Sequence, residues 1–286
     1  MLKKLLAGLY LLGSLVNIAN SGDSTGNLIS KINKYDKIEV VSENKNTKIS
    51  SFEKKIEKIG PYDVSVYYKN SKDNWQEQFL DKKIKIAYDK DEVGIKLKSE
   101  DGFIKNIFKF SYYKAKGRYK GFTWALNPLE RKTIKYGSKI EDKLIFKLDN
   151  NVEIYLKFGL DNYVRTTIPS IYYENWKINS QGIGFEVKNK HFKFNVDFSK
   201  LIGIVKAKGL KGLEFKGHSL LKGNEISANL EIRPKKNLSI EFYYDVRKYG
   251  DGTKTIAVFY NDNYLGQTYQ PKGYEKEIGI RINYYF

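Results

Sequence analysis

The sequence predicts an all-β protein, a single closed antiparallel β-barrel that crosses a membrane. First, apolar and polar residues alternate with a period of two through most of residues 59–286. Second, the last ten residues alternate without a break, and Ile278, Ile280, Ile282, Tyr284 and Phe286 share one face. Third, aromatic residues make up 15% of the chain, which suits the girdles of a membrane barrel. Because an unpaired final strand would leave an open edge, we expect it to close the barrel against the first strand.

Residues 1–21 have the pattern of a cleaved secretory signal peptide. A basic start at Lys3 and Lys4 precedes a short apolar run, and Ala19-Asn20-Ser21 offers a small-x-small cleavage site. A membrane anchor is the alternative, but the apolar run is short for a helix that needs about 20 residues to span a bilayer. Export and the aromatic final residue together predict the outer membrane of a Gram-negative cell.

Residues 22–58 form a polar leader that differs from the rest of the chain. Ser50 to Glu53 resembles a helix-capping box, and Phe52, Ile56 and Ile59 have helical spacing. The leader is either a small plug or periplasmic segment with a short helix, or a flexible arm. We therefore divide the chain into a signal peptide (1–21), a leader (22–58) and a barrel (59–286).

The period-two segments predict about twelve strands, or up to fourteen if the longer loops contain hairpins. In chain order they cover residues 62–68, 84–88, 93–97, 108–112, 122–126, 144–148, 152–158, 183–187, 192–198, 226–232, 238–246 and 277–286. Tight turns are expected at 90–91, 149–151, 189–190 and 234–236, and longer connections at 70–80, 161–181, 199–223 and 248–272. Short turns on one side and long loops on the other are typical of membrane barrels.

The charge predicts anionic partners. The net charge is +18, and a mean hydropathy of −0.54 fits a barrel in which every second strand residue faces lipid. An exported chain without a recognition motif is not expected to bind nucleic acid, which leaves lipopolysaccharide and small anionic solutes. We also expect the final strand, ending at Phe286, to engage the barrel assembly machinery.

If the apolar face meets lipid, the alternate residues line a lumen. The candidate pore-lining and solute-binding residues are Lys83, Lys85, Lys96, Lys98, Lys105, Lys109, Lys143, Lys147, Lys157, Arg233, Arg247 and Arg281. In the first half of the barrel only Asp63 and Glu153 oppose these lysines, whereas inward carboxylates are common in the second half. The pattern predicts a basic wall facing a mixed wall across a water-filled lumen that attracts anions. The alternative is that lysine is simply the usual polar residue of this chain.

The connection at 199–223 repeats Lys-Gly four times, from Lys208 to Gly223. Folded inward it would narrow the lumen with positive charge, and folded outward or as a hairpin it could contact lipopolysaccharide phosphates.

Catalysis is not expected. The only histidines are His191 and His218, and His218 and its neighbour Ser219 would point to opposite faces of a strand. The chain has no cysteine, and two histidines make a poor metal site, so we expect no metal and no cofactor.

Two segments carry a family resemblance. Residues 81–94, with the preceding Val64-Ser-Val-Tyr-Tyr-Lys69 and the aromatic C-terminus, resemble the oligogalacturonate-specific porin family of outer-membrane barrels. The resemblance implies a small barrel of about twelve strands that passes acidic oligosaccharides, with Lys83 and Lys85 on the wall of a basic lumen.

The sequence thus predicts a porin for passive diffusion of small hydrophilic solutes, favouring anions and including acidic oligosaccharides. The alternative is an outer-membrane barrel that anchors adhesive or lipid-binding loops and has no conducting pore.

Overall fold

The computed structural model describes residues 63–79, 82–122, 128–168, 172–209, 212–253, 255–268 and 270–286. The predicted signal peptide and leader lie outside the described residues. The strands are β1 (Asp63–Phe79), β2 (Lys82–Asp101), β3 (Ile104–Phe122), β4 (Pro128–Lys147), β5 (Val152–Ile168), β6 (Tyr172–Lys188), β7 (Phe192–Gly209), β8 (Leu213–Gly217), β9 (Ser219–Lys235), β10 (Leu238–Tyr249), β11 (Ile256–Tyr260), β12 (Asn263–Thr268) and β13 (Gly273–Tyr285). In this part of the chain, no helix is long and apolar enough to cross a bilayer.

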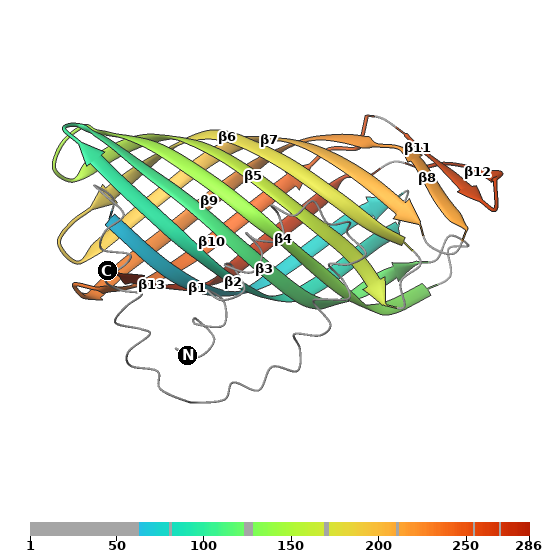
Figure 1. Ribbon diagram of the computed structural model, residues 1–286, viewed down its shortest axis with the longest axis horizontal. Coiled ribbons are helices and arrows are strands. Elements are labelled where there is room, and N and C mark those ends of the chain that lie inside the picture. The colour runs from blue at the N-terminus through green and yellow to red at the C-terminus, as the bar shows by residue number, and fades with distance from the viewer. Residues whose placement is uncertain are drawn as a thin grey trace, which may run out of the picture.

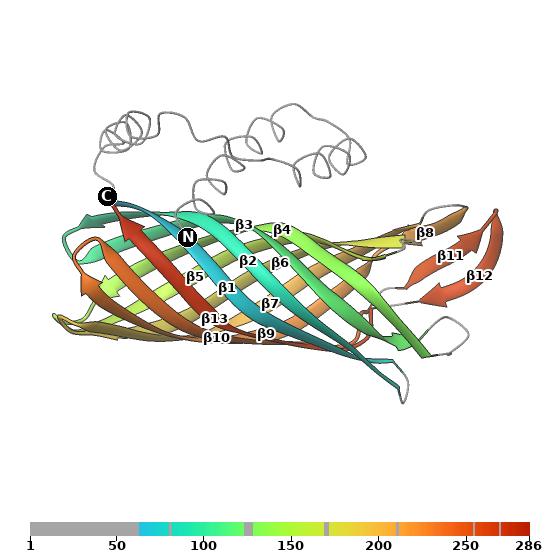
Figure 2. The same ribbon diagram turned by 90° about the horizontal axis from the view of Figure 1, so that it is seen from below.

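Ten of these strands form a closed antiparallel barrel (Figures 1 and 2). Around the ring the order is β1, β13, β10, β9, β7, β6, β5, β4, β3 and β2. The final strand pairs with the first over a long register, from Ser65 opposite Tyr285 to Glu77 opposite Gly273. The predicted barrel and its closure by the C-terminal strand are therefore confirmed.

The predicted count of twelve strands is wrong, and the count is ten. Residues 84–88 and 93–97 both lie on β2, which passes through the predicted turn at Lys90 and Asp91 without interruption. Of the predicted strand at 122–126, Phe122 is the last residue of β3, and the others lie outside the described ranges. The strands are also longer than expected: β1 includes most of the predicted loop 70–80, and β5 and β6 include most of 161–181.

The other three predicted turns are confirmed within a residue or two, between β4 and β5, β6 and β7, and β9 and β10. These short turns and the C-terminus lie at one end of the barrel, which we call the turn end (Figure 1). The opposite, loop end carries a separate three-stranded sheet of β8, β11 and β12. The segment 199–223 therefore extends β7, adds β8 to this outer sheet and returns as β9, in line with the hairpin interpretation.

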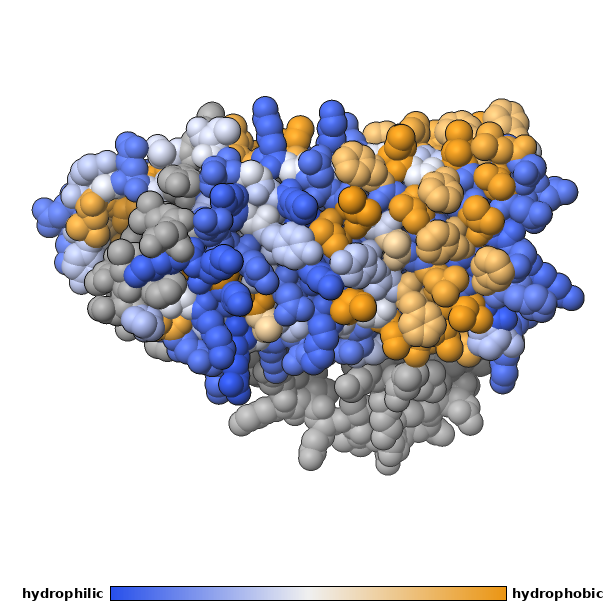
Figure 3. Space-filling model, turned by 180° about the vertical axis from the view of Figure 1, so that it is seen from behind, coloured by the Kyte–Doolittle hydropathy of each residue, from blue (hydrophilic) through white to orange (hydrophobic). Residues whose placement is uncertain are grey.

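The outer surface of the barrel has two zones (Figure 3). Near the turn end large apolar side chains project outward, among them Ile183, Phe198 and Ile278, which are 65%, 47% and 51% exposed. Toward the loop end most outward residues of the barrel strands are polar, as at Asn74 on β1 and Lys177 on β6. Because β2 and β4 each contain 20 residues, they are about twice as long as the 9–11 residues that a strand needs to cross a bilayer. The loop-end half of the barrel thus stands outside the apolar zone.

Candidate functional site in the barrel lumen

The inward faces of the ten barrel strands carry both signs of charge. Alternation along each strand defines these faces, because successive side chains point to opposite sides of a sheet. The inward basic residues are Lys69, Lys82, Lys90, Lys96, Lys98, Lys105, Lys109, Arg131, Lys135, Lys139, Lys143, Lys147, Lys157, Arg165, Lys188, Lys193, Arg233, Arg247 and Arg281. The inward carboxylates are Asp63, Asp73, Glu77, Glu92, Glu100, Glu141, Glu153, Asp161, Glu174, Glu186, Asp197, Glu225, Glu231, Glu241, Asp245, Glu275 and Glu277. The lumen as a whole is therefore close to charge balance, but β1–β5 carry more cations than carboxylates and the strands from β6 to β13 carry fewer, so the charge is lopsided in the predicted direction.

Two predicted pore residues do not line the lumen at all. Lys83 and Lys85 lie on the outer face of β2 and are exposed, while Ile84 and Ile86 point inward. The prediction failed because it placed a turn at residues 90–91, and such a turn would have reversed the faces of everything before it. Since β2 is continuous, Lys83 and Lys85 share the outward face of Val93 and Leu97.

The other ten predicted residues do face inward, and nine of them are paired with carboxylates. The ion pairs are Lys98 with Asp63 (3.2 Å) and Glu100 (3.0 Å), Lys105 with Glu153, Lys109 with Glu141 (2.8 Å), Lys143 with Asp197 (3.5 Å), Lys147 with Glu100, Lys157 with Asp197 (2.7 Å) and Glu225 (3.3 Å), Arg233 with Glu231 (2.9 Å), Arg247 with Glu225 (2.9 Å) and Asp161 (3.0 Å), and Arg281 with Glu241 (2.8 Å). Lys96 is the exception: in the described part of the chain, no carboxylate lies within ion-pair distance of its ammonium.

Many of these pairs cross the lumen instead of following the wall. Lys135 on β4 contacts Asp73 on β1 at 3.1 Å and also Glu275 on β13, and all three side chains are almost fully buried. Arg247 on β10 reaches Asp161 on β5 at 3.0 Å, four strands away around the ring. Charges buried this deeply are tolerated only when they are paired and hydrogen-bonded. The pairs therefore act as struts that fill the lumen.

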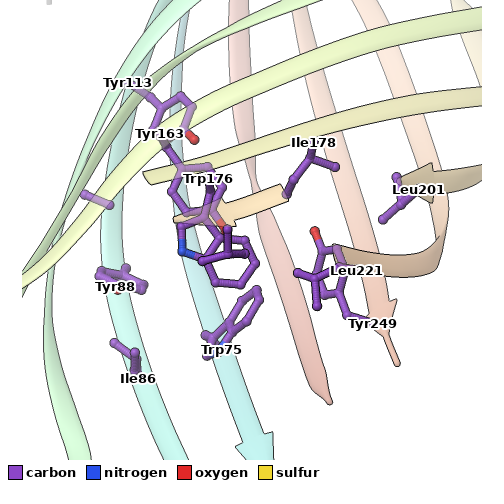
Figure 4. Close-up of a cluster of buried hydrophobic side chains, with 12 residues drawn as sticks. Trp75, Ile86, Tyr88, Tyr113, Tyr163, Trp176, Ile178, Leu201, Leu221 and Tyr249 are labelled. Atoms are coloured by element: carbon purple, nitrogen blue, oxygen red, sulfur yellow. The ribbon is translucent and has the colours of Figure 1, made fainter. Parts of the chain in front are cut away.

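An aromatic crossbar closes the lumen above these struts, toward the loop end (Figure 4). It consists of Trp75, Tyr163, Trp176 and Tyr249, each at most 4% exposed. Trp75 on β1 and Trp176 on β6 come from strands on opposite sides of the ring, yet their ring centroids are only 5.3 Å apart. Tyr163 stacks on Trp176 with centroids 5.4 Å apart. Side chains that meet across the full diameter obstruct the lumen at this level.

Charged groups hold the crossbar in place. Arg165 lies over both tryptophan rings, with its guanidinium carbon 5.1 Å from the Trp75 ring and 5.2 Å from the Trp176 ring. The same guanidinium binds Glu77 at 2.6 Å and Glu174 at 2.8 Å. Gln270, from the segment before β13, donates to Glu77 at 3.0 Å. Cation–π contacts of this kind contribute about 2 kcal/mol when they are desolvated.

The turn end, in contrast, is hollow. A cavity of about 450 Å³, which we call the vestibule, is bounded there by the ends of β2, β6 and β9 and the starts of β1, β3 and β7. Its lining residues are Asp63, Val64, Ser65, Lys96, Lys98, Glu100, Lys105, Ile107, Glu186, Lys188, Asn189, Lys190, Phe192, Lys193, Arg233, Lys236, Tyr285 and Phe286. Four of the predicted residues, Lys96, Lys98, Lys105 and Arg233, meet here.

Sequence reasoning missed the crossbar and several struts. Trp75 and Asp73 were assigned to a loop, and Tyr163, Arg165 and Trp176 to another. The available signal was the alternation itself, in which Asp73, Trp75 and Glu77 share a face. In this half of the barrel the apolar residues lie inside, so the alternation has the opposite polarity to that of a lipid-facing strand.

The histidines lie at opposite ends of the barrel. His191 is in the turn between β6 and β7, and His218 is between β8 and β9. Ser219 is buried and accepts a hydrogen bond from the Gln270 backbone N–H at 3.2 Å, whereas His218 is partly exposed. Within the described ranges, no group of three or more histidine, aspartate or glutamate side chains is placed to hold a metal ion.

Comparison with known proteins supports the fold. No protein-family model matches the chain, and no curated protein matches it. Among solved structures the chain is similar to the outer membrane protease OmpT from Escherichia coli, with a TM-score of 0.50 and 10% identity, covering 79% of this chain and 96% of that one. Weaker likenesses include the translocator domain of the autotransporter NalP from Neisseria meningitidis (TM-score 0.44, 8% identity, 84% and 94% covered) and Ail from Yersinia pestis (0.37, 12%, 78% and 98%). The chain thus has the fold of outer-membrane β-barrels.

Proposed function

We propose that this protein is a non-conducting barrel of the Gram-negative outer membrane that binds anionic lipopolysaccharide through its outer surface. The observation that supports the first part is the filled lumen, in which Trp75 and Trp176 meet from opposite strands above a layer of buried ion pairs. The apolar outer zone near the turn end supports insertion in a membrane. With the short turns in the periplasm, the loop-end half stands on the cell surface.

The second part rests on a basic collar on the outer face of that half. The collar consists of six exposed residues on three neighbouring strands: Lys83 and Lys85 on β2, Lys116, Arg118 and Lys120 on β3, and Lys132 on β4. Two carboxylates accompany it. Glu130 lies 3.7 Å from Arg118 and 3.6 Å from Lys120, and Asp89 pairs with Lys72. The collar is therefore only partly neutralised from within the protein.

Like charges stand directly opposite each other within the collar. The register places Lys85 opposite Lys120, and Arg118 opposite Lys132. Like charges in directly opposed positions destabilise a sheet by a few tenths of a kcal/mol up to about 1 kcal/mol. An anionic partner outside the barrel would remove this repulsion, and the phosphate groups of lipopolysaccharide have the required charge.

Recording in planar bilayers tests the closed lumen. We expect the purified full-length protein, inserted in a bilayer, to give no steady single-channel conductance. A stable anion-selective conductance would contradict the proposal and would favour the porin predicted from the sequence.

That anion channel remains the second candidate, and the basic vestibule is the observation that favours it. Cations such as Lys96, Lys193 and Arg233 would concentrate anions at this mouth. For conduction, however, the struts and the crossbar would both have to move aside.

Binding to lipopolysaccharide micelles tests the collar. The variant Lys83→Gln/Lys85→Gln/Arg118→Gln removes three charges at about 1 kcal/mol each, so we expect roughly hundredfold weaker binding at low salt. Lys190→Gln/Lys235→Gln/Lys236→Gln, which removes three charges at the turn end, is the matched control and should bind nearly as the parent does. Equal losses in the two variants would indicate only a general effect of net charge and would contradict a specific collar.

A further inference from the structure

We propose that the vestibule is a binding site for a small phosphorylated solute, which enters from the turn end and does not pass through the barrel. The cavity is large enough, because its volume of about 450 Å³ lies within the range of about 300–1,000 Å³ that is common for small-molecule sites. The struts lie between the vestibule and the loop end, so we expect an occupant to enter and leave at the turn end.

The charge of the vestibule differs from that of the lumen above it. Among its lining residues the cations are Lys96, Lys98, Lys105, Lys188, Lys190, Lys193, Arg233 and Lys236, and the carboxylates are Asp63, Glu100 and Glu186. Glu153 and Glu231, which do not line the vestibule, pair with Lys105, Lys188 and Arg233, and among the described residues Lys96, Lys190 and Lys236 are the lining cations without a carboxylate within ion-pair distance. A cavity with an excess of one sign attracts counter-ions of the other.

Lys96 is the cation with the clearest need for a partner. No carboxylate of the described chain lies within ion-pair distance of it, although it faces into the barrel. Its ammonium lies 5.8 Å from the centre of the Tyr285 ring, and the guanidinium carbon of Arg233 lies 5.3 Å from the same centre. The Tyr285 ring therefore brings two cations from β2 and β9 to one side of the vestibule.

Glu186 provides the second, independent observation. Its side chain is 3% exposed, and Oε2 binds Lys193 at 3.0 Å, whereas Oε1 accepts no hydrogen bond and has only the Lys105 ammonium 3.9 Å away. A buried carboxylate oxygen without a donor is costly, so a partner with a hydroxyl group would be favoured here.

Together these groups fit a phosphate attached to a hydroxylated body. A phosphate carries up to two negative charges and three strong acceptor oxygens, which suits cations that come from β2, β7 and β9. A sugar hydroxyl could then donate to Glu186, and Ile107 and Phe192 provide an apolar wall for the body of the solute.

Isothermal titration calorimetry of the full-length protein in detergent tests this site with glucose 6-phosphate, inorganic phosphate and glucose as probes. We expect saturable binding of glucose 6-phosphate, weaker binding of phosphate and none of glucose. Lys96→Gln should weaken glucose 6-phosphate binding at least tenfold, and Lys96→Arg should largely preserve it. Lys177→Gln, which removes an exposed outward lysine of β6 that belongs to neither the vestibule nor the collar, is the matched control and should bind as the parent does.

The variant Glu186→Gln separates the binding of phosphate by the cations from the binding of a hydroxyl group by the carboxylate. Without the carboxylate, inorganic phosphate should bind at least as well as before, and the advantage of glucose 6-phosphate over phosphate should shrink. No saturable binding, or equal losses in Lys96→Gln and Lys177→Gln, would overturn the proposal. Binding of these probes depends neither on conductance nor on lipopolysaccharide. If no solute binds in the vestibule, the proposed function is unaffected, and if the barrel conducts ions or does not bind lipopolysaccharide, the solute site is unaffected.

Discussion

The two halves of the barrel are built from the same strands but are inverted relative to each other. Near the turn end the apolar side chains point out, as Phe185 does, and paired charges such as Lys157 and Asp197 point in. Near the loop end Lys85 and Asn74 point out, and a cluster that includes Trp176 and Leu221 is buried inside. The surroundings explain the difference, because lipid surrounds the first half and water surrounds the second.

The inversion shows why a pattern of alternation can mislead. Along β2 the inward series runs from Ile84 and Tyr88 through Lys90 and Glu92 to Lys98 without changing face. Only the polarity of that series changes, from apolar to charged. In the sequence, such a change of polarity looks the same as a change of face at a turn. This is how one strand was counted as two.

The largest expected effect tests where the apolar core of the loop-end half lies. Trp176→Ala removes the centre of the crossbar, and we expect it to lower the free energy of unfolding by about 3–5 kcal/mol. Phe185→Ala on the same strand faces lipid and is 45% exposed, so it should cost clearly less. Urea unfolding in lipid vesicles gives the free energy of unfolding of both variants. It is followed by gel mobility, because that signal does not depend on tryptophan. Equal costs would contradict an inward core.

A smaller effect tests the two outer zones. Ile280→Arg places a charge in the apolar zone of β13 and should lower the free energy of unfolding by about 2–4 kcal/mol. Asn74→Arg on the neighbouring β1 lies in the polar zone and should change it little. Unfolding of both variants in the same vesicles gives the comparison. If Asn74→Arg were as costly as Ile280→Arg, the loop-end half would lie within the membrane.

The smallest effect concerns the repulsion within the collar. Lys85→Glu converts the like-charged pair with Lys120 into an opposite-charged pair, and we expect a gain of about 0.2–1 kcal/mol at low salt. The gain should shrink as salt is added, because both side chains are exposed. A loss of stability at low salt would show that Lys85 does not face Lys120 on the outer surface.

Several features could be predicted because each depends on local pattern alone. The outward positions of Ile278, Ile280 and Tyr284 follow from strict alternation in a lipid-facing strand, and β13 does pair with β1. The turns at 149–151 and 189–190 follow from clusters of Asp and Asn, and the Asp149 and Asn189 side chains accept hydrogen bonds from backbone N–H groups there.

The candidate site was predicted only in part. Alternation placed Lys96, Lys105 and Arg233 inside, and the vestibule brings them together. It did not show that Lys157 would meet Glu225, because these residues are far apart in sequence and three strands apart in the ring. Whether an inward charge is paired or free depends on which strands face each other across the lumen.

The sequence alone determined that this chain forms a β-barrel, which strand closes it, and which residues of that final strand meet lipid, because lipid imposes a simple alternation there. The tertiary structure decided that there are ten strands, that Lys83 and Lys85 lie outside, and that the lumen is filled. The physical reason is that these outcomes depend on contacts across the barrel. Trp75 and Trp176 can meet only once the ring has closed with β1 opposite β6.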